Sequence, residues 1–229
     1  MALFLDTGKI DLVRKYHAMG IVRGVTTNPT ILVKEGSARN LAEVEKQIRE
    51  VAELIHPLPV SVEVTSNDEP QMLKQAQAFS KWGTNINVKI PIHGPAGELF
   101  NLRLVRELES THNIRINVTA MMNAQQCFLA ALAGATFVSL FGGRVNDMGY
   151  NACAEIHRIR MLLDRFQLKA KLILGSTREP LNVIEWLEAG ADIVTVRPEL
   201  IDKVLIHPYS LETVKEFVRE GAKIEKGLS

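Results

Sequence analysis

The chain has 229 residues, of which 46% are hydrophobic and 23% charged, and its 27 basic and 26 acidic side chains leave a formal net charge of +1. This is the composition of a globular protein, which excludes a disordered chain and argues against a nucleic-acid partner. Asparagine and glutamine interrupt the longest uncharged stretch, 116–143, so no membrane span is predicted. The first residues lack a basic region and a small-residue cleavage site, so no signal peptide is expected and a cytoplasmic location is predicted.

Short β-rich runs alternate along the chain with longer segments of helical spacing, as in βα units around a parallel sheet. The predicted strands are Leu3–Asp6, Gly24–Thr27, Val60–Thr65, Ile86–Ile90, Arg115–Thr119, Phe137–Leu140, Lys171–Leu174 and Ile193–Val196. Between them, segments such as Leu41–Leu54 and Pro180–Leu187 carry apolar residues at three- and four-residue steps. These segments are predicted to be amphipathic crossover helices.

These units predict a single (β/α)8 TIM barrel over residues 1–229, because no Pro-, Gly- or Ser-rich linker divides the chain. A doubly wound open sheet is the alternative, but no glycine-rich phosphate loop follows an early strand. An extra C-terminal helix is predicted at about 210–222. Its apolar face, which is expected to pack on its own barrel or on a neighbouring subunit, consists of Leu211, Val214, Phe217 and Val218.

Polar residues recur at the strand ends, where barrel enzymes place their catalytic side chains. Lys89 is the most informative, because its neighbours Val88 and Ile90 are apolar. Such a lysine either snorkels to the barrel mouth or lies desolvated, and desolvation favours a neutral amine that can attack a carbonyl. Asp6 and Glu63 are carboxylates in apolar strands, so they either carry protons in a reaction or form buried ion pairs.

Arg144 and Arg178 follow the sixth and seventh predicted strands, and Ser176 lies beside the second of them. Two guanidinium groups and a hydroxyl at this end of a barrel predict a site for a tetrahedral anion. The six histidines are scattered and no metal-binding motif occurs, so neither a metal nor a cofactor is expected. Cys127 and Cys153 are predicted to be reduced thiols.

Several of these segments resemble known signatures. Gly24–Thr30 closely resembles the second-strand signature of transaldolases, and Asn87–Pro91 resembles the strand that carries their Schiff-base lysine. The similarity continues in order through Asn117–Thr119, Ser139–Arg144 and Gly175–Arg178, so it spans nearly the whole chain. The chain is therefore similar to the short transaldolases and the bacterial fructose-6-phosphate aldolases, a superfamily of class I aldolase barrels.

The resemblance implies a role for each motif residue. Lys89 would form an imine with the carbonyl of a ketose, and Asp6 would accept the proton of the C4 hydroxyl. Glu63 and Thr119 would hold a water molecule that relays protons. The other implied contacts are those of Asn28, Asn117 and Ser139 to hydroxyls of the retained dihydroxyacetone unit, with support from Thr26, and those of Arg144, Ser176 and Arg178 to the terminal anion.

Two positions distinguish the subgroups of this superfamily. The free aldolases carry Gln where this chain has Glu63 and Tyr where it has Phe141, so the resemblance favours transfer over release. The expected reaction transfers a dihydroxyacetone unit to an aldehyde such as glyceraldehyde 3-phosphate or erythrose 4-phosphate. An aldolase that releases free dihydroxyacetone and an inactive barrel that binds sugar phosphates are the alternatives.

The chain departs from its relatives beside the predicted anion site, at Leu140, Gly142–Gly143 and Asn146–Gly149. The expected donor is therefore either a ketose 6-phosphate or 6-deoxy-6-sulfofructose, because phosphate and sulfonate differ in charge. Partners are expected to be these small sugars and further copies of the chain, since short members of the superfamily are commonly homo-oligomers.

Overall fold

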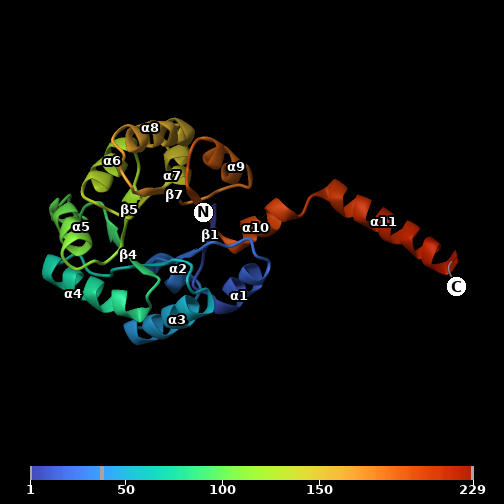
Figure 1. Cartoon of the computed structure of the whole chain (residues 1–229), viewed down its shortest axis with the longest axis horizontal. Helices are drawn as coiled ribbons and strands as arrows, with labels where there is room; N and C mark the ends of the chain where they lie inside the picture. The colour runs from blue at the N-terminus through green and yellow to red at the C-terminus, as the bar shows by residue number, and fades with distance from the viewer. Residues whose placement is uncertain (1, 37–38, 228–229) are drawn as a thin grey trace.

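The structure, a computed structural model, describes residues 2–36 and 39–227. Within them, eight parallel strands close into a barrel in sequence order, from β1 to β8 and back to β1. Helices surround the barrel, which confirms the predicted (β/α)8 fold (Figure 1). The strands are β1 Leu3–Asp6, β2 Val25–Thr26, β3 Val60–Glu63, β4 Ile86–Pro91, β5 Ile116–Met121, β6 Phe137–Leu140, β7 Lys171–Leu174 and β8 Ile193–Val196.

The strands alternate with α-helices and one short 3-10 helix. The helices are α1 Ile10–Ala18, α2 Pro29–Lys34, α3 Leu41–Leu54, α4 Glu69–Phe79, η1 Ser80–Trp82, α5 Phe100–Ser110, α6 Ala124–Leu132, α7 Gly142–Asp147, α8 Ala152–Arg165, α9 Leu181–Glu188, α10 Pro198–Leu205 and α11 Pro208–Gly227. None of the helices in the described part of the chain is both long enough and apolar enough to span a membrane.

Four strands have the predicted bounds, and the others differ at their ends. β2 is shorter than predicted, because Asn28 already caps α2 by accepting a hydrogen bond from the Ile31 N–H at 3.0 Å. β5 runs on past Thr119, because its pairing with β6 shifts register after Val118, and Ala120 in this irregular stretch has a φ of 61°. A sequence pattern does not reveal such a bulge, which depends on the neighbouring strand.

The barrel interior is filled in layers by alternate residues of the strands. An apolar cluster of Phe4, Phe137, Ile173 and Ile193 lies there, separate from the larger core between sheet and helices. Gly24 makes room for this cluster, because a Cβ at its position would lie 2.6 Å from the Phe4 ring. The next inward positions along three of these strands carry the polar residues Asp6, Ser139 and Thr195. The fold therefore separates a packed floor from a polar upper layer.

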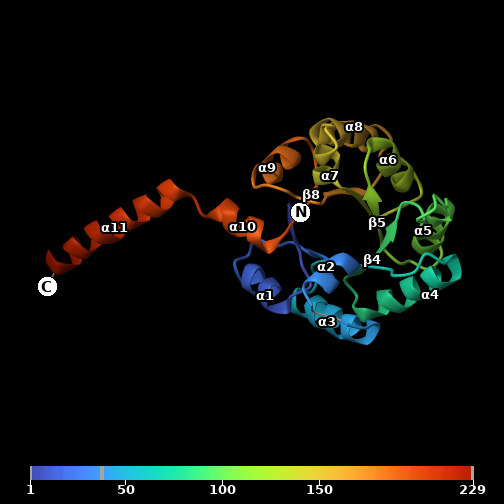
Figure 2. The same cartoon turned by 180° about the vertical axis from the view of Figure 1, so that it is seen from behind.

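The C-terminal helix α11 extends away from the barrel, as both views show (Figures 1 and 2). It begins before and ends after the predicted range of about 210–222, because Pro208 suits a first helical turn and the following residues are good helix formers. Its predicted apolar face is unpartnered within the chain, with Leu211 50% and Val218 68% exposed. The helix does not pack on its own barrel.

Candidate active site

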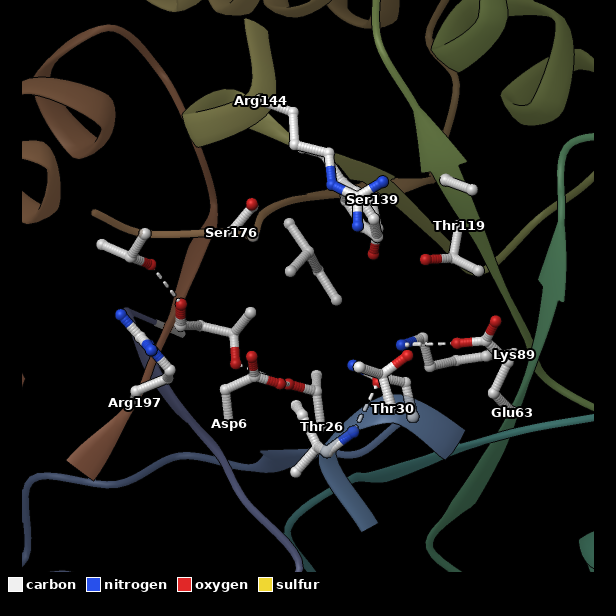
Figure 3. A pocket seen from close by; sticks show the side chains of 18 of the residues that line it. Asp6, Thr26, Thr30, Glu63, Lys89, Thr119, Ser139, Arg144, Ser176 and Arg197 are labelled. Carbon is white, nitrogen blue, oxygen red and sulfur yellow. Dashed lines mark hydrogen bonds and ion pairs between the residues drawn. The ribbon is translucent and has the colours of Figure 1, made fainter. Parts of the chain in front are cut away.

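A cavity of about 440 Å³ opens at the carboxyl ends of the strands. All of the predicted site residues except Asn117 line it: Asp6, Thr26, Asn28, Glu63, Lys89, Thr119, Ser139, Phe141, Arg144, Ser176 and Arg178. They come from seven strands or from the segments that follow them, and the predicted residues that Figure 3 labels, among them Asp6, Lys89 and Arg144, surround one space. The barrel therefore brings distant parts of the sequence together at one mouth.

Lys89 lies on the inner wall of the cavity and is only 4% exposed. Its Nζ is 3.1 Å from Glu63 Oε2 and donates a hydrogen bond of 2.9 Å to the Thr27 carbonyl. Glu63 and Lys89 are register partners on β3 and β4, so their side chains emerge beside each other. The sequence predicted a lysine that snorkels or lies desolvated, and the structure shows a buried amine that has a carboxylate partner.

Asp6 faces the same cavity from β1, away from the Lys89–Glu63 pair (Figure 3). Its Oδ1 accepts a hydrogen bond of 2.7 Å from the Thr26 hydroxyl. Burial raises the pKa of Asp6 above its usual range, and the Thr26 bond and the positive charge of Lys89 oppose that rise. A carboxyl group with a raised pKa in a cavity is a candidate proton carrier.

Thr119 ends the predicted part of β5 and is 1% exposed. Its Oγ1 is buried and has no hydrogen-bond partner among the described residues. Ala120, directly after it, also lines the cavity and has the left-handed φ of 61° noted above. A buried hydroxyl without a partner at the cavity wall is suited to hold a water molecule or a substrate group.

Asn117 is the predicted site residue that does not line the cavity. Its Nδ2 donates to Ser61 Oγ at 3.2 Å, and its Oδ1 accepts from Ser139 Oγ at 2.6 Å. These contacts are buried and fix the Ser139 hydroxyl, which does line the cavity. The sequence could not show that Ser139 lines the cavity and Asn117 does not, because both residues are expected at inward-facing positions of adjacent strands.

The two predicted arginines have different surroundings. Arg178 donates to Asp147 from Nη2 at 2.6 Å and from Nε at 3.1 Å, and this contact lowers the pKa of the Asp147 carboxyl. Arg144 lies over the Phe141 ring at 5.2 Å, and no salt bridge holds it among the described residues. Phe141 and Asp147 therefore orient the two guanidinium groups. The role of Asp147 was not predicted.

The glycine pair before Arg144 is required by packing. A Cβ at Gly143 would lie 1.8 Å from the Ser176 carbonyl oxygen, and Ser176 itself has a φ of 64°. A Cβ at Gly142 would lie 2.8 Å from the Trp186 ring. Helix α7, which carries Arg144, and the loop that carries Ser176 thus approach so closely that only glycine fits between them.

Sequence reasoning missed five polar residues of the cavity, which are Thr30, Lys34, Thr177, Thr195 and Arg197. The rule that polar residues at strand ends line the mouth would have found Thr195 and Arg197, because they lie in and directly after β8. Thr30 and Lys34 lie on α2, whose place over the mouth depends on the packing of the whole barrel. With Arg144 and Arg178, Lys34 and Arg197 make the cavity rim cationic.

Among the residues that the structure describes, no group of three or more His, Cys, Asp and Glu side chains is placed to hold a metal ion. Cys127 and Cys153 are free; Cys127 is buried, and its burial raises the pKa of its thiol. Neither cysteine lines the cavity.

Both the sequence and the fold of this chain are similar to those of known proteins. The profile of the Transaldolase/Fructose-6-phosphate aldolase family matches residues 3–227. A probable transaldolase of Carboxydothermus hydrogenoformans is 39% identical over 99% of this chain and 100% of its own length. A probable transaldolase of Leptospira biflexa is 36% identical over 98% of this chain and 99% of its own length.

Solved structures with little sequence similarity share the fold. The thiamine phosphate pyrophosphorylase of Pyrococcus furiosus superposes with a TM-score of 0.61 at 11% identity, covering 89% of this chain and 93% of that protein. A putative deoxyribose-phosphate aldolase of Coccidioides immitis also gives 0.61, at 10% identity, over 90% of this chain and 85% of its own. These similarities concern the barrel alone.

Proposed function

The chain belongs to the Transaldolase/Fructose-6-phosphate aldolase family, and we propose that it is a transaldolase that works through a lysine Schiff base. The observation that carries the proposal is the buried Lys89 Nζ, which lies inside the cavity and 3.1 Å from Glu63 Oε2. A primary amine can form an imine with a ketone once it has lost its proton, and an adjacent carboxylate can take that proton.

The first half of the reaction forms the imine. Glu63 takes a proton from the Lys89 ammonium, and Nζ attacks the ketone carbon of the donor. The oxygen of the resulting carbinolamine then leaves as water after it has been protonated, which leaves a C=N bond to Lys89. The unpartnered hydroxyl of Thr119 supports a water molecule in this proton relay, with Glu63 at its other side.

The second half breaks and remakes a carbon–carbon bond. Asp6 accepts the proton of the C4 hydroxyl, the C3–C4 bond breaks, and its electron pair moves towards the imine nitrogen to form an enamine. The aldehyde fragment leaves with the C4 oxygen as its carbonyl. An acceptor aldehyde then enters and the steps run backwards, so Asp6 returns the proton to the new hydroxyl group. The position of Asp6 across the cavity from Lys89 suits this role.

Transfer is favoured over release at two positions. Glu63 and Phe141 line the cavity where the free aldolases carry Gln and Tyr. Phe141 offers no hydroxyl to assist water in protonating the enamine, so the intermediate lasts until an aldehyde arrives. An assay for free dihydroxyacetone without an acceptor distinguishes transfer from the alternative aldolase activity.

We place the terminal anion of the donor at Arg144, Ser176 and Arg178, next to the loops after β6 and β7. Hydroxyls of the retained unit would bind Ser139 and Asn28, with Asn117 holding Ser139 from below. The cationic rim suits either a ketose 6-phosphate or 6-deoxy-6-sulfofructose as donor, and glyceraldehyde 3-phosphate or erythrose 4-phosphate as acceptor.

A panel of donors tests this function directly. With erythrose 4-phosphate as acceptor, we expect transfer from fructose 6-phosphate or 6-deoxy-6-sulfofructose and far slower transfer from fructose. Arg144→Gln removes a guanidinium group from the anion site, so kcat/KM for the anionic donors should fall by about 10- to 100-fold while the rate with fructose stays the same.

Arg165→Gln is a matched control for this variant, because Arg165 also lies over a phenylalanine ring, that of Phe166, on the outer face of α8. Equal losses with neutral and anionic donors in Arg144→Gln would contradict the anion site. Absence of transfer from every donor in the wild-type protein would contradict the proposed function.

We further propose that the apolar face of α11 packs on a neighbouring copy of the chain. This face is exposed within one chain, with Phe217 67% and Val214 56% exposed. Burial of such side chains contributes about 1.5–3 kcal/mol each, which is a strong drive towards association.

The double variant V214E/F217E is therefore expected to dissociate into single chains of 25.5 kDa, as measured by light scattering after gel filtration. Glu212→Lys changes charge on the side of the same helix away from that apolar face and should leave the oligomer intact. A wild-type protein that elutes as a single chain would contradict the proposal.

A further inference from the structure

A buried pair of threonine hydroxyls lies behind the carboxylate of Asp6. Thr26 on β2 and Thr195 on β8 are 3% and 6% exposed, and their Oγ1 atoms are 2.5 Å apart. Thr26 Oγ1 also donates to Asp6 Oδ1 at 2.7 Å. Three strands that are neighbours in the barrel, β8, β1 and β2, thus contribute one oxygen each to a continuous chain of hydrogen bonds beside the cavity. Figure 3 shows two of its members, Asp6 and Thr26, side by side.

The number of hydroxyl protons determines the direction of this chain. Thr26 has a single hydroxyl proton, and it donates that proton in a hydrogen bond to Asp6 Oδ1 when the carboxyl group is ionised. The Thr26 oxygen can then only accept in its contact with Thr195, so Thr195 is the donor. Both hydroxyls therefore point towards Asp6. Such a chain polarises its members, which strengthens the bond to the carboxylate.

The chain also assigns the two oxygens of Asp6 to different tasks. Oδ1 accepts the hydrogen bond from Thr26, whereas none of the described side chains or backbone groups donates a hydrogen bond to Oδ2. The proposed mechanism needs one free carboxylate oxygen to take the proton of the C4 hydroxyl. Oδ2 meets that need, while Oδ1 stays fixed by Thr26.

The backbone holds Thr195 in place from two sides. The carbonyl oxygen of Thr195 accepts a hydrogen bond of 2.6 Å from Thr177 Oγ1. Thr195 is also the register partner of Phe4 in the pairing of β8 with β1. Phe4 itself belongs to the packed floor of the barrel. A rigid part of the fold therefore fixes the position of the Thr195 hydroxyl beside Thr26, as accurate positioning of an active-site group requires.

We infer that Thr195 is a positioning residue, which directs the Thr26 hydroxyl onto Asp6 Oδ1 and so leaves Oδ2 free for the substrate. This inference rests on the proposed function for its link to turnover. It concerns a residue that touches Asp6 only through Thr26, so Thr195 acts on the reaction indirectly.

The electrostatic surroundings of Asp6 show why this donor chain matters. Burial raises the pKa of Asp6, and the charge of Glu35 raises it further. The Thr26 hydrogen bond, Lys89 and Arg197 lower it. Asp6 must be ionised to accept a proton, so the loss of any stabilising group shifts the acid limb of kcat/KM to higher pH.

Thr195→Val tests the inference, because valine has the same shape but no hydroxyl group. We expect kcat to fall about five- to tenfold, the acid limb of kcat/KM to move to higher pH, and KM for the donor to change less than about twofold. Thr195→Ser keeps the hydroxyl and should restore the wild-type profile. Thr84→Val is a matched control, since its hydroxyl contacts His56 outside the cavity.

A titration that does not depend on turnover separates this inference from the proposed function. In protein labelled with ¹³C at the aspartate carboxyl carbons and assigned with Asp6→Asn, Thr195→Val should raise the pKa of Asp6. An unchanged Asp6 titration in a folded Thr195→Val protein would overturn the inference, whatever the activity. A raised pKa in a protein that transfers no dihydroxyacetone would support the hydrogen-bond chain and refute the function instead.

Discussion

Replacement of Lys89 by methionine is expected to lower kcat by at least about 10⁴-fold, because the thioether cannot form an imine. Methionine matches the length of the lysine stem in a site where Lys89 is 4% exposed. With donor present, borohydride should fix a three-carbon adduct on Lys89 of the wild-type protein, and peptide mass spectrometry should find none in the variant.

Two further variants control for the loss of the ion pair. Lys89→Met leaves the Glu63 carboxylate without its partner at 3.1 Å. This lowers the stability of the protein independently of any effect on imine formation. The double variant K89M/E63Q removes that charge and should fold more stably but remain inactive. Lys203→Met, on the outer helix α10, should keep full activity. An adduct on another lysine, or turnover by Lys89→Met, would show that the chemistry lies elsewhere.

Gly143→Ala is expected to have the next largest effect. Its Cβ would lie 1.8 Å from the Ser176 carbonyl oxygen, a backbone atom that cannot rotate away. Either α7 or the loop that carries Ser176 must therefore move, which displaces Arg144 or Ser176 from the anion site. We expect a loss of about 2–4 kcal/mol in the free energy of unfolding and a fall of about 100-fold in kcat/KM for anionic donors.

Gly221→Ala provides the comparison, because within one chain no atom outside the adjacent backbone of α11 lies within 4 Å of a Cβ at that position. A glycine within a helix costs about 0.5–1 kcal/mol relative to alanine, so this variant should be as stable as the wild type or more stable. Thermal unfolding and donor kinetics measure both variants. A Gly143→Ala protein with normal stability and normal kinetics would show that the contact between α7 and the loop that carries Ser176 is not required.

The strand-end rule predicted most of the mouth from the sequence. Asp6, Glu63 and Lys89 stand out because a charged side chain in an apolar strand needs a partner or a function, and that conflict is visible without coordinates. Arg144 and Arg178 were found because both follow predicted strands within a few residues and together suit an anion. The predicted bounds were wrong at the ends of β2, β3, β4 and β5. At β2 and β5 a helix cap and a shift of register override local preference.

Partners across the barrel were beyond prediction. Asp147 holds Arg178, and Thr195 contacts Thr26 although 169 residues separate them in the chain. The glycines at 142–143 read as a bare loop in the sequence, but the structure shows them packed against Trp186 and the Ser176 carbonyl. Each of these contacts depends on how loops from different βα units meet.

The sequence by itself determined the fold class and the chemical groups at the mouth, because hydrophobic periodicity and charges in apolar strands are local properties of the chain. The tertiary structure alone decided which group contacts which. Closure of the barrel sets the register between strands, and that register fixes the distance from Lys89 to Glu63 and the path from Thr195 to Asp6.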